Sequence, residues 1–253
     1  MLKLIGDTGP VDMFGWNLEG IADSSPVSET ATKAVFFNAE DNETYVFTGK
    51  GFTYDHGQPT GGTITGFEYH IGDNENFHVT GMKISVEDFL SHVGGGDILG
   101  LMQQVLADGD SIKGSALGDT LYGLDGDDIV NGGKGDDTIT GGAGADTLSG
   151  SKGNDTFILG ALSDSTNAAA DTITDIDKRD TIDLSAIDAS TAKKGDQAFN
   201  LVDAFTHHAG ELVLSYDEGQ DRTAVQMDVD GDGAADATLY LSGDQSGFHH
   251  FVF

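Results

Sequence analysis

Several residue types are scarce in this chain, and each scarcity excludes a class of function. There is no cysteine, proline and tryptophan number three and one, and only 12 of 253 residues are lysine or arginine. Without cysteine there is no disulfide bond, thiolate metal ligand or thiol nucleophile. Binding to nucleic acid or to an anionic membrane is not expected, because both need clustered positive charge.

Long hydrophobic runs are also missing. No apolar segment reaches the roughly 18 residues of a membrane-spanning helix, so membrane insertion is not expected. Residues 1–16 contain a lysine and an early aspartate but no continuous apolar run. A cleaved N-terminal secretory signal is therefore not expected either.

Acidic residues and glycine are abundant instead. The chain has 43 acidic residues and a formal charge of -31, and aspartates outnumber glutamates 34 to 9. Aspartate is the short carboxylate that fits tight turns and oxygen cages around hard cations. Glycine, at 37 residues, also favours turns. So much negative charge opposes compaction unless something neutralises it.

A nine-residue pattern repeats through residues 114–158. Five rows, beginning at residues 114, 123, 132, 141 and 150, approximate Gly-Gly-x-Gly-x-Asp-x-apolar-x. The sixth position is always aspartate and the eighth is always apolar. A preceding row without the glycine pattern keeps Asp110 and Ile112 in phase and is expected to be a cap. A flexible acidic linker would have no reason to keep the apolar phase.

The repeat predicts stacked turns and strands. The glycine-rich part favours a turn, and the last three positions form a minimal strand with one side chain pointing inward. Two rows then make one coil of a right-handed parallel β-roll, whose coils stack about 4.8 Å apart. A single row cannot bury its apolar face, so several rows must stack to form a core.

Stacked turns bring carboxylates of rows n and n+2 together. The expected pairs are Asp119 with Asp137, Asp137 with Asp155, and Asp128 with Asp146. Asp110 with Asp128 is an additional candidate pair. Ca²⁺ would relieve their repulsion, because it takes roughly six to eight oxygen ligands from carboxylates and carbonyls. Asp127 and Asp136 are expected to point outward. About three to seven ions are expected, bound by Asp110, Asp119, Asp128, Asp137, Asp146 and Asp155 together with Gly123, Gly132, Gly135, Gly141, Gly144 and Gly150.

A second acidic group resembles the start of an EF-hand loop. Asp228, Asp230 and Asp232 are followed by a glycine, but Leu239 replaces the glutamate expected at position 12. Two interpretations stay open: a turn between strands 222–228 and 237–242, or an additional calcium site.

Rows 114–158 resemble the repeats of the RTX family, proteins secreted by Gram-negative bacteria. Residues 106–253 are similar to the non-catalytic C-terminal domain of serralysin-type secreted proteases, through segments 164–166, 171–175, 180–185, 209–216 and 228–233. The resemblance implies calcium binding and favours a further site that closes the roll, made by Asp164, Asp171 and Asp175. It also implies an uncleaved C-terminal secretion signal, which the apolar ending Phe251–Phe253 fits. A type I exporter, built from an ABC transporter, a periplasmic adaptor and an outer-membrane channel, would then deliver the protein to the extracellular medium.

The proteolytic activity of that family is not implied. None of the eight histidines has the His-Glu-x-x-His spacing of a zinc protease, and no Gly-x-Ser-x-Gly nucleophile motif occurs. Catalysis is therefore not expected, although a small N-terminal catalytic domain stays an alternative. Haem capture is another, through a pair chosen from Tyr54, His56, Tyr69, His70 and His78.

The chain divides by pattern into three segments. Residues 1–105 are expected to form a β-rich domain with one or two helices, 106–158 the calcium-loaded β-roll, and 159–253 a C-terminal β cap that carries the secretion signal. The fold class is thus mainly β. Residues 55–62 predict a hairpin turn, Ser85 a helix start and Asp97 a second helix cap. Strands are expected at 34–37, 44–48, 52–54, 63–71, 77–84, 211–216, 222–228 and 237–242.

Taken together, the sequence predicts a secreted calcium-binding RTX protein that folds on meeting extracellular Ca²⁺ after export. The N-terminal segment is expected to be a binding or interaction module. The alternatives are a secreted enzyme with a small N-terminal catalytic domain and a hemophore-like ligand carrier.

Overall fold

The computed structural model describes residues 25–38, 43–55, 58–71, 74–95 and 98–253. Its first part is a sheet of consecutive antiparallel strands. The strands are β1 (Ser25–Glu29), β2 (Lys33–Asn38), β3 (Glu43–Asp55), β4 (Gln58–Ile71) and β5 (Asn74–Ser85). Two helices follow, α2 (Val86–Gly95) and α3 (Ile98–Val105).

The sequence pattern predicted most of these elements, but it split β3 into two strands and did not predict β1. Segments 44–48 and 52–54 belong to one long strand, β3, because register irregularities between Thr48 and Tyr54 let pairing with β4 continue. The β3–β4 hairpin is confirmed, although it is tighter than predicted: Asp55 pairs with Gln58, and residues 56–57 lie outside the described residues. The pattern did not predict β1.

The start of α2 is confirmed as a capped end. The Ser85 hydroxyl accepts a hydrogen bond from the Asp88 amide at 2.9 Å and donates one to Asp88 Oδ2 at 2.7 Å. A serine that satisfies a free amide of the first turn is a typical N-cap. The predicted Asp97 cap of α3 lies outside the described residues.

The repeats form the middle of the molecule, with successive rows alternating between two parallel ladders. β6 pairs with β8 and β8 with β10, while β7 pairs with β9 and β9 with β11. Most of these strands have six residues rather than three, because each continues into the glycines of the next row. The strands are β6 (Ser111–Lys113), β7 (Thr120–Asp125), β8 (Ile129–Lys134), β9 (Thr138–Ala143), β10 (Thr147–Lys152) and β11 (Thr156–Ile158).

The eighth-position side chains fill the interior of the roll, as predicted. All five are at most 3% exposed, and Ile112 of the preceding row is 1% exposed. The five are Leu121, Val130, Ile139, Leu148 and Phe157. Pairing of Ile112 with Val130 and of Val130 with Leu148 keeps each apolar layer directly above the previous one.

The C-terminal part extends both sheets. β12 (Thr172–Ile173) follows β10, and β13 (Thr181–Asp183) follows β11. β17 pairs with β12, and β18 pairs with β13 at the edge of the smaller sheet. The remaining strands are β14 (Asn200–Val202), β15 (Glu211–Asp217), β16 (Arg222–Asp228), β17 (Ala237–Ser242) and β18 (Phe251–Val252), so the predicted strands at 211–216, 222–228 and 237–242 are confirmed.

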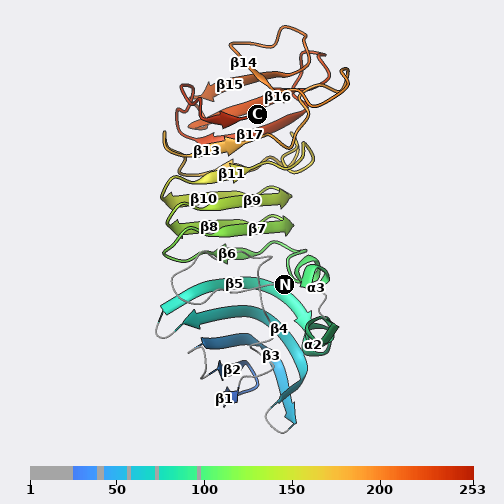
Figure 1. Cartoon of the computed structure of the whole chain (residues 1–253), viewed down its shortest axis with the longest axis vertical. Helices are drawn as coiled ribbons and strands as arrows, with labels where there is room; N and C mark the ends of the chain where they lie inside the picture. Colours follow the sequence, from blue (N-terminus) through green and yellow to red (C-terminus); the bar gives the residue numbers. More distant parts are fainter. Residues whose placement is uncertain (1–24, 39–42, 56–57, 72–73, 96–97) are drawn as a thin grey trace.

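Within the described residues, one 13-stranded sheet runs from β1 through β6, β8 and β10 to β14, and a five-stranded sheet runs from β7 to β18. Figure 1 shows these strands stacked along the long axis, with the N-terminal sheet at one end and β14–β17 at the other. One hydrophobic core includes residues of all three segments, from Ala34 to Phe248. No helix in the described part of the chain is both long and apolar enough to cross a membrane.

Candidate metal centre

The sixth-position aspartates stack along the roll, and the predicted pairs are neighbours in space. In each pair the backbone N–H of the earlier residue donates to Oδ1 of the aspartate 18 residues later. The Asp110 amide donates to Asp128 at 2.7 Å, and the Asp128 amide donates to Asp146 at 2.8 Å. On the other edge, the Asp119 amide donates to Asp137 at 2.7 Å, and the Asp137 amide donates to Asp155 at 2.9 Å.

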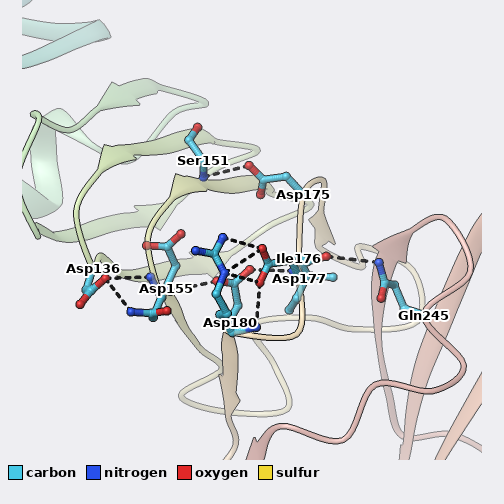
Figure 2. Close-up of polar contacts among 10 residues, drawn as sticks. Asp136, Ser151, Asp155, Asp175, Ile176, Asp177, Asp180 and Gln245 are labelled. Atoms are coloured by element: carbon cyan, nitrogen blue, oxygen red, sulfur yellow. Dashed lines mark hydrogen bonds and ion pairs between the residues drawn. The ribbon is translucent and has the colours of Figure 1, made fainter.

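Both ladders extend beyond the repeats by a step of 25 residues. The Asp146 amide donates to Asp171 Oδ1, and the Asp155 amide donates to Asp180 Oδ1, each at 3.0 Å. Figure 2 shows Asp155 and Asp180 side by side. We call Asp110, Asp128, Asp146 and Asp171 the first ladder, and Asp119, Asp137, Asp155 and Asp180 the second ladder.

Asp180 is not among the ligands that the nine-residue pattern predicts. The change from 18 to 25 residues breaks the nine-residue period that identified the others. A shorter signal was present, because Asp-Thr-Ile occurs at 137–139 and again at 171–173 and 180–182. That tripeptide marks a ladder aspartate followed by an inward-pointing side chain.

The ladder carboxylates are buried, and several of their oxygens have no donor. All eight aspartates are at most 4% exposed. Oδ2 of Asp128, Asp137 and Asp146 has no hydrogen-bond partner, and neither oxygen of Asp110 has one. Burying an unpaired carboxylate oxygen costs free energy, so these positions need a cation or a proton.

Burial dominates the electrostatics of the ladders. It raises the pKa of Asp110, Asp128 and Asp137 to about 7 and that of Asp146 to about 6, and neighbouring carboxylates raise them further. Asp171, also buried, has its pKa raised to about 8. The ladders therefore resist full ionisation near neutral pH unless positive charge is supplied.

The glycines of each row shape the space around these carboxylates. At Gly123, Gly132, Gly141 and Gly150, a Cβ atom would overlap Oδ2 of the aspartate in the same row. At Gly135 and Gly144 the backbone has φ of +105° and +146°, and a Cβ would overlap the backbone two rows earlier. The predicted glycines thus let each turn close tightly around its carboxylate.

This donor set fits a hard divalent cation. The buried oxygens belong to carboxylates on glycine-rich turns, whose carbonyls can supply further oxygen ligands. Ca²⁺ takes roughly six to eight oxygen ligands in a flexible geometry, which such turns can provide. The unpaired Oδ2 atoms of Asp128, Asp137 and Asp146 are the observation that most directly matches this requirement.

Asp119 differs from the others because the serine at the second position of its row, Ser115, donates hydrogen bonds to its carboxylate. The Ser115 hydroxyl donates to Asp119 Oδ1 at 3.0 Å, and the Ser115 amide donates to Oδ2. The first turn of the second ladder therefore has protein donors for its carboxylate.

Asp127 and Asp136 are exposed, as expected, but each also links two coils. Asp127 Oδ1 accepts a hydrogen bond from the Ala145 amide at 2.9 Å. Asp136 Oδ1 accepts one from the Asn154 amide at 2.8 Å, as Figure 2 shows. These fifth-position carboxylates brace the outside of the turns.

Two of the three carboxylates expected to close the roll lie near each other. After burial and Asp146, the charge of Asp164 also helps to raise the pKa of Asp171, whereas Asp175 lies beyond β12, so an ion held by all three stays a prediction. Asp171 accepts from the Asp146 amide at one end of β10, whereas Asp175 accepts from the Ser151 amide at the other end, at 2.9 Å (Figure 2). Strand β12 separates them. Asp164 Oδ2 also accepts a hydrogen bond from the Ala161 amide of its own turn at 2.9 Å.

The loop between β16 and β17 brings three other carboxylates together. Ligand oxygens of Asp228, Asp230 and Asp236 lie within 4.8 Å of one another. The predicted third member, Asp232, instead accepts from the Ala234 amide at 2.7 Å. Asp236 stands at the ninth position of the loop, which is also a ligand position in EF-hands, so the same spacing could have indicated it.

The turn interpretation of this loop is confirmed, because β16 and β17 pair antiparallel on either side of it. Asp228 is fully buried and already has donors for both carboxylate oxygens, from the Gly231 amide at 2.6 Å and the Gly233 amide at 2.9 Å. An ion at this loop stays a prediction.

The predicted haem ligands are only partly described. The Tyr54 hydroxyl donates to the carbonyl oxygens of Thr30 and Lys33 at 2.9 and 3.2 Å. His56 lies outside the described residues, and the side chains of Tyr69, His70 and His78 are likewise not described. A cavity of about 30 Å³ between the N-terminal sheet and α2 is lined by Ala34, Phe36, Phe47, Phe52, Pro59, Ile64, Val86, Phe89 and Leu90. Haem capture stays a prediction.

The model of the family described as "Peptidase M10 serralysin C terminal" matches residues 111–253. Metalloprotease AprA of Pseudomonas entomophila (strain L48) is 41% identical over 80 residues. That match covers 32% of this chain and 16% of the metalloprotease, so the chain spans only a small part of its relative.

Two solved structures are similar over more than half of the chain. Both are solution structures of subunits of a mannuronan C5-epimerase from Azotobacter vinelandii. The AlgE6R3 subunit is 28% identical with a TM-score of 0.44, covering 58% of this chain and 78% of its own. The AlgE6R2 subunit is 26% identical with a TM-score of 0.40, covering 56% of this chain and 91% of its own.

Proposed function

Because the chain belongs to the peptidase M10 serralysin C-terminal family, with RTX repeats in its centre, we propose that it is a secreted protein that binds Ca²⁺ and folds on binding it. The observation that carries this proposal is the pair of buried aspartate ladders with unpaired carboxylate oxygens. An ion that neutralises them also permits the apolar layers beneath them to pack.

Ion binding and folding are coupled in this proposal. Without Ca²⁺, stacking the turns would bring buried carboxylates such as Asp128 and Asp146 together, and their repulsion opposes closure of the roll. With Ca²⁺, oxygens on adjacent coils share the positive charge. The binding free energy then becomes folding free energy, as in other metal-dependent modules. About three to seven ions per chain would serve the two ladders and the β16–β17 loop.

This coupling suits export through a narrow channel. We propose that the chain leaves the cell unfolded through a type I exporter of ABC transporter, periplasmic adaptor and outer-membrane channel. Low free calcium in the cytoplasm keeps the repeats open, and extracellular calcium folds them. The family resemblance supports this route. In the folded chain the Leu184 amide donates to the Val252 carbonyl at 2.9 Å, so an exporter would have to read this ending before folding.

Calcium titration of the full chain tests the central claim. Circular dichroism at neutral pH should show a cooperative gain of β-type signal as Ca²⁺ replaces EDTA, with Mg²⁺ at the same concentration as a control. A folded signal that persists unchanged in EDTA would refute coupled folding.

The N-terminal segment is proposed to act as a binding or interaction module. Strand β5 of its sheet pairs with β6 of the roll. In this proposal the roll folds on binding calcium and then holds the N-terminal sheet in place. Activity screens and haem absorbance measured on the full chain would separate this role from an enzyme or a hemophore-like carrier. Turnover of a substrate, or a haem Soret band, would replace the proposed role.

A further inference from the structure

The first ladder ends toward the N-terminal sheet on a carboxylate with no partner. Asp110 is 3% exposed, and neither of its oxygens accepts a hydrogen bond. The other ladder ends differ. Asp119 receives donors from Ser115, Asp171 from the Asp146 amide, and Asp180 from the amides of Asp155 and Asp177.

The missing donor has a structural cause. Along the ladder, Oδ1 of each aspartate accepts an amide from the coil before it. The place before β6 is taken by β5, which pairs antiparallel with β6 through Thr80 and Ser111. Strand β5 is not a repeat row, and it offers Asp110 no amide.

Strand β5 bulges beside Asp110, and we call the place where Gly81 meets Gly109 and Asp110 the corner. Between its pairs Gly66–Thr80 and Ile64–Ile84 with β4, β5 contains extra residues and bulges. Gly81 lies in this bulge with φ of +100°, and a Cβ there would stand 2.5 Å from Asp110 Oδ1 and 3.0 Å from the Gly109 carbonyl oxygen. A carboxylate oxygen and a carbonyl oxygen therefore face the same glycine, which is itself exposed to solvent.

The charges that act on Asp110 are negative. The charged groups that act on Asp110 are Asp108 and Asp128, from its own turn and from the next coil. Oxygen atoms gathered without a donor call for a hard cation.

We propose that Asp110 and the Gly109 carbonyl, with the Gly81 bulge as the opposite wall, form a terminal calcium site that joins the N-terminal sheet to the roll. The proposal rests on calcium binding by the repeats and adds a consequence for residues outside them. Calcium at this corner fixes β5 against β6, so the docking of the N-terminal sheet depends on calcium. The ion thus controls when the N-terminal module is presented as a rigid body.

The test compares Asp110→Asn with Asp146→Asn in the full chain. Asparagine keeps the shape of the side chain and removes the charge at one ladder position in each variant. Two readouts are measured: bound calcium per chain by equilibrium dialysis, and backbone hydrogen exchange by mass spectrometry. Exchange is followed in residues 78–84 and 111–113 at the junction, and in residues 138–158 inside the roll.

Asp110→Asn should lose one ion and exchange faster at the junction while residues 138–158 stay protected. At free calcium one hundred times the Kd of the site, loss of the ion speeds exchange about a hundredfold if the junction opens independently. Asp146→Asn should instead weaken protection within residues 138–158.

Other outcomes separate the two proposals. An Asp110→Asn chain that keeps its full ion count and its junction protection would overturn the terminal site. The carboxyl group of Asp110 in the wild-type chain would then not be a calcium ligand. Failure of the wild-type chain to bind or respond to Ca²⁺ would overturn the proposed function itself. If Asp110→Asn does not fold, Gly81→Ala leaves every carboxylate in place, and retention of all ions in that variant would equally refute the site.

Discussion

The backbone N–H of Asp146 donates to Oδ1 of Asp171 at 3.0 Å, although these residues are 25 positions apart rather than 18. The carboxylate ladder therefore continues beyond the nine-residue repeats of residues 114–158. The same step joins Asp155 to Asp180 on the other edge. The C-terminal part continues the roll instead of merely covering its end, and its strands inherit the alignment of the coils.

Removing a shared ladder carboxylate should weaken calcium-dependent folding more than removing an outer one. Asp137 lies between Asp119 and Asp155, so Asp137→Ala affects turns on both sides. We expect the calcium midpoint measured by circular dichroism to rise by about tenfold or more, equivalent to ~1.4 kcal/mol. Asp127→Ala is the control, because Asp127 is exposed and its described hydrogen bond comes from the Ala145 amide. Equal midpoints would show that the ligands are assigned to the wrong position.

A methyl group on the first glycine of a row should displace the carboxylate beside it. In Gly132→Ala the new Cβ would overlap Asp137 Oδ2, so calcium affinity should fall, again by roughly tenfold. Gly247→Ala provides the matched control, because nothing lies within 4 Å of its Cβ position. Isothermal titration calorimetry measures both. Unchanged affinity in Gly132→Ala would mean that the turn can relax without moving its ligand.

Two isoleucines offer a paired test of the core. Ile139 is fully buried, whereas Ile129 is 56% exposed. In saturating calcium, Ile139→Ala should lower the free energy of unfolding by about 2–5 kcal/mol through lost burial and the cavity left behind. Ile129→Ala should change it by about 0.5 kcal/mol or less. Urea denaturation followed by circular dichroism gives both values, and similar losses would contradict the inward phase of the eighth position.

The calcium-free chain should become less stable as the pH rises. The pKa of Asp128 and Asp137 is raised from 3.8 to about 7, and that of Asp171 to about 8, so folding favours their protonated forms. That stabilisation is fully present below about pH 4 and is lost as the pH rises through about 7 to 8. In EDTA, the folded fraction measured by circular dichroism should therefore fall between pH 5 and pH 8. A stability that increases over that interval would contradict burial of the unpaired carboxylates.

In the presence of calcium, stability should instead increase with pH, because carboxylates bind Ca²⁺ only when they are deprotonated. Protons and Ca²⁺ compete for oxygens such as Oδ2 of Asp137, so calcium affinity should fall as the pH drops below about 7. Calcium titrations at pH 5, 6, 7 and 8 measure the effect. The Asp137→Ala chain, which lacks one competing group, should show a weaker pH dependence, and an identical dependence would exclude Asp137 as a contributor.

Local signals in the sequence located elements whose cause is local. The Ser85 cap was predictable because a serine three residues before an aspartate satisfies a helix amide without distant contacts. Strands 222–228 and 237–242 were predictable from their composition and from the turn between them. Strand β1 and the union of 44–48 with 52–54 depend on pairing with other strands, which the local pattern does not describe.

By itself, the sequence determined the nine-residue phase, the inward position of Ile139 and its equivalents, and the pairing of aspartates 18 residues apart. These follow from repetition, because each coil must place the same atoms one strand spacing above the last. Only the tertiary structure decided which residues continue the ladders after Asp155, why Asp236 replaces Asp232 beside Asp228, and why Asp110 faces the β5 bulge. Those positions depend on contacts between segments far apart in the chain, where no period relates one residue to the next.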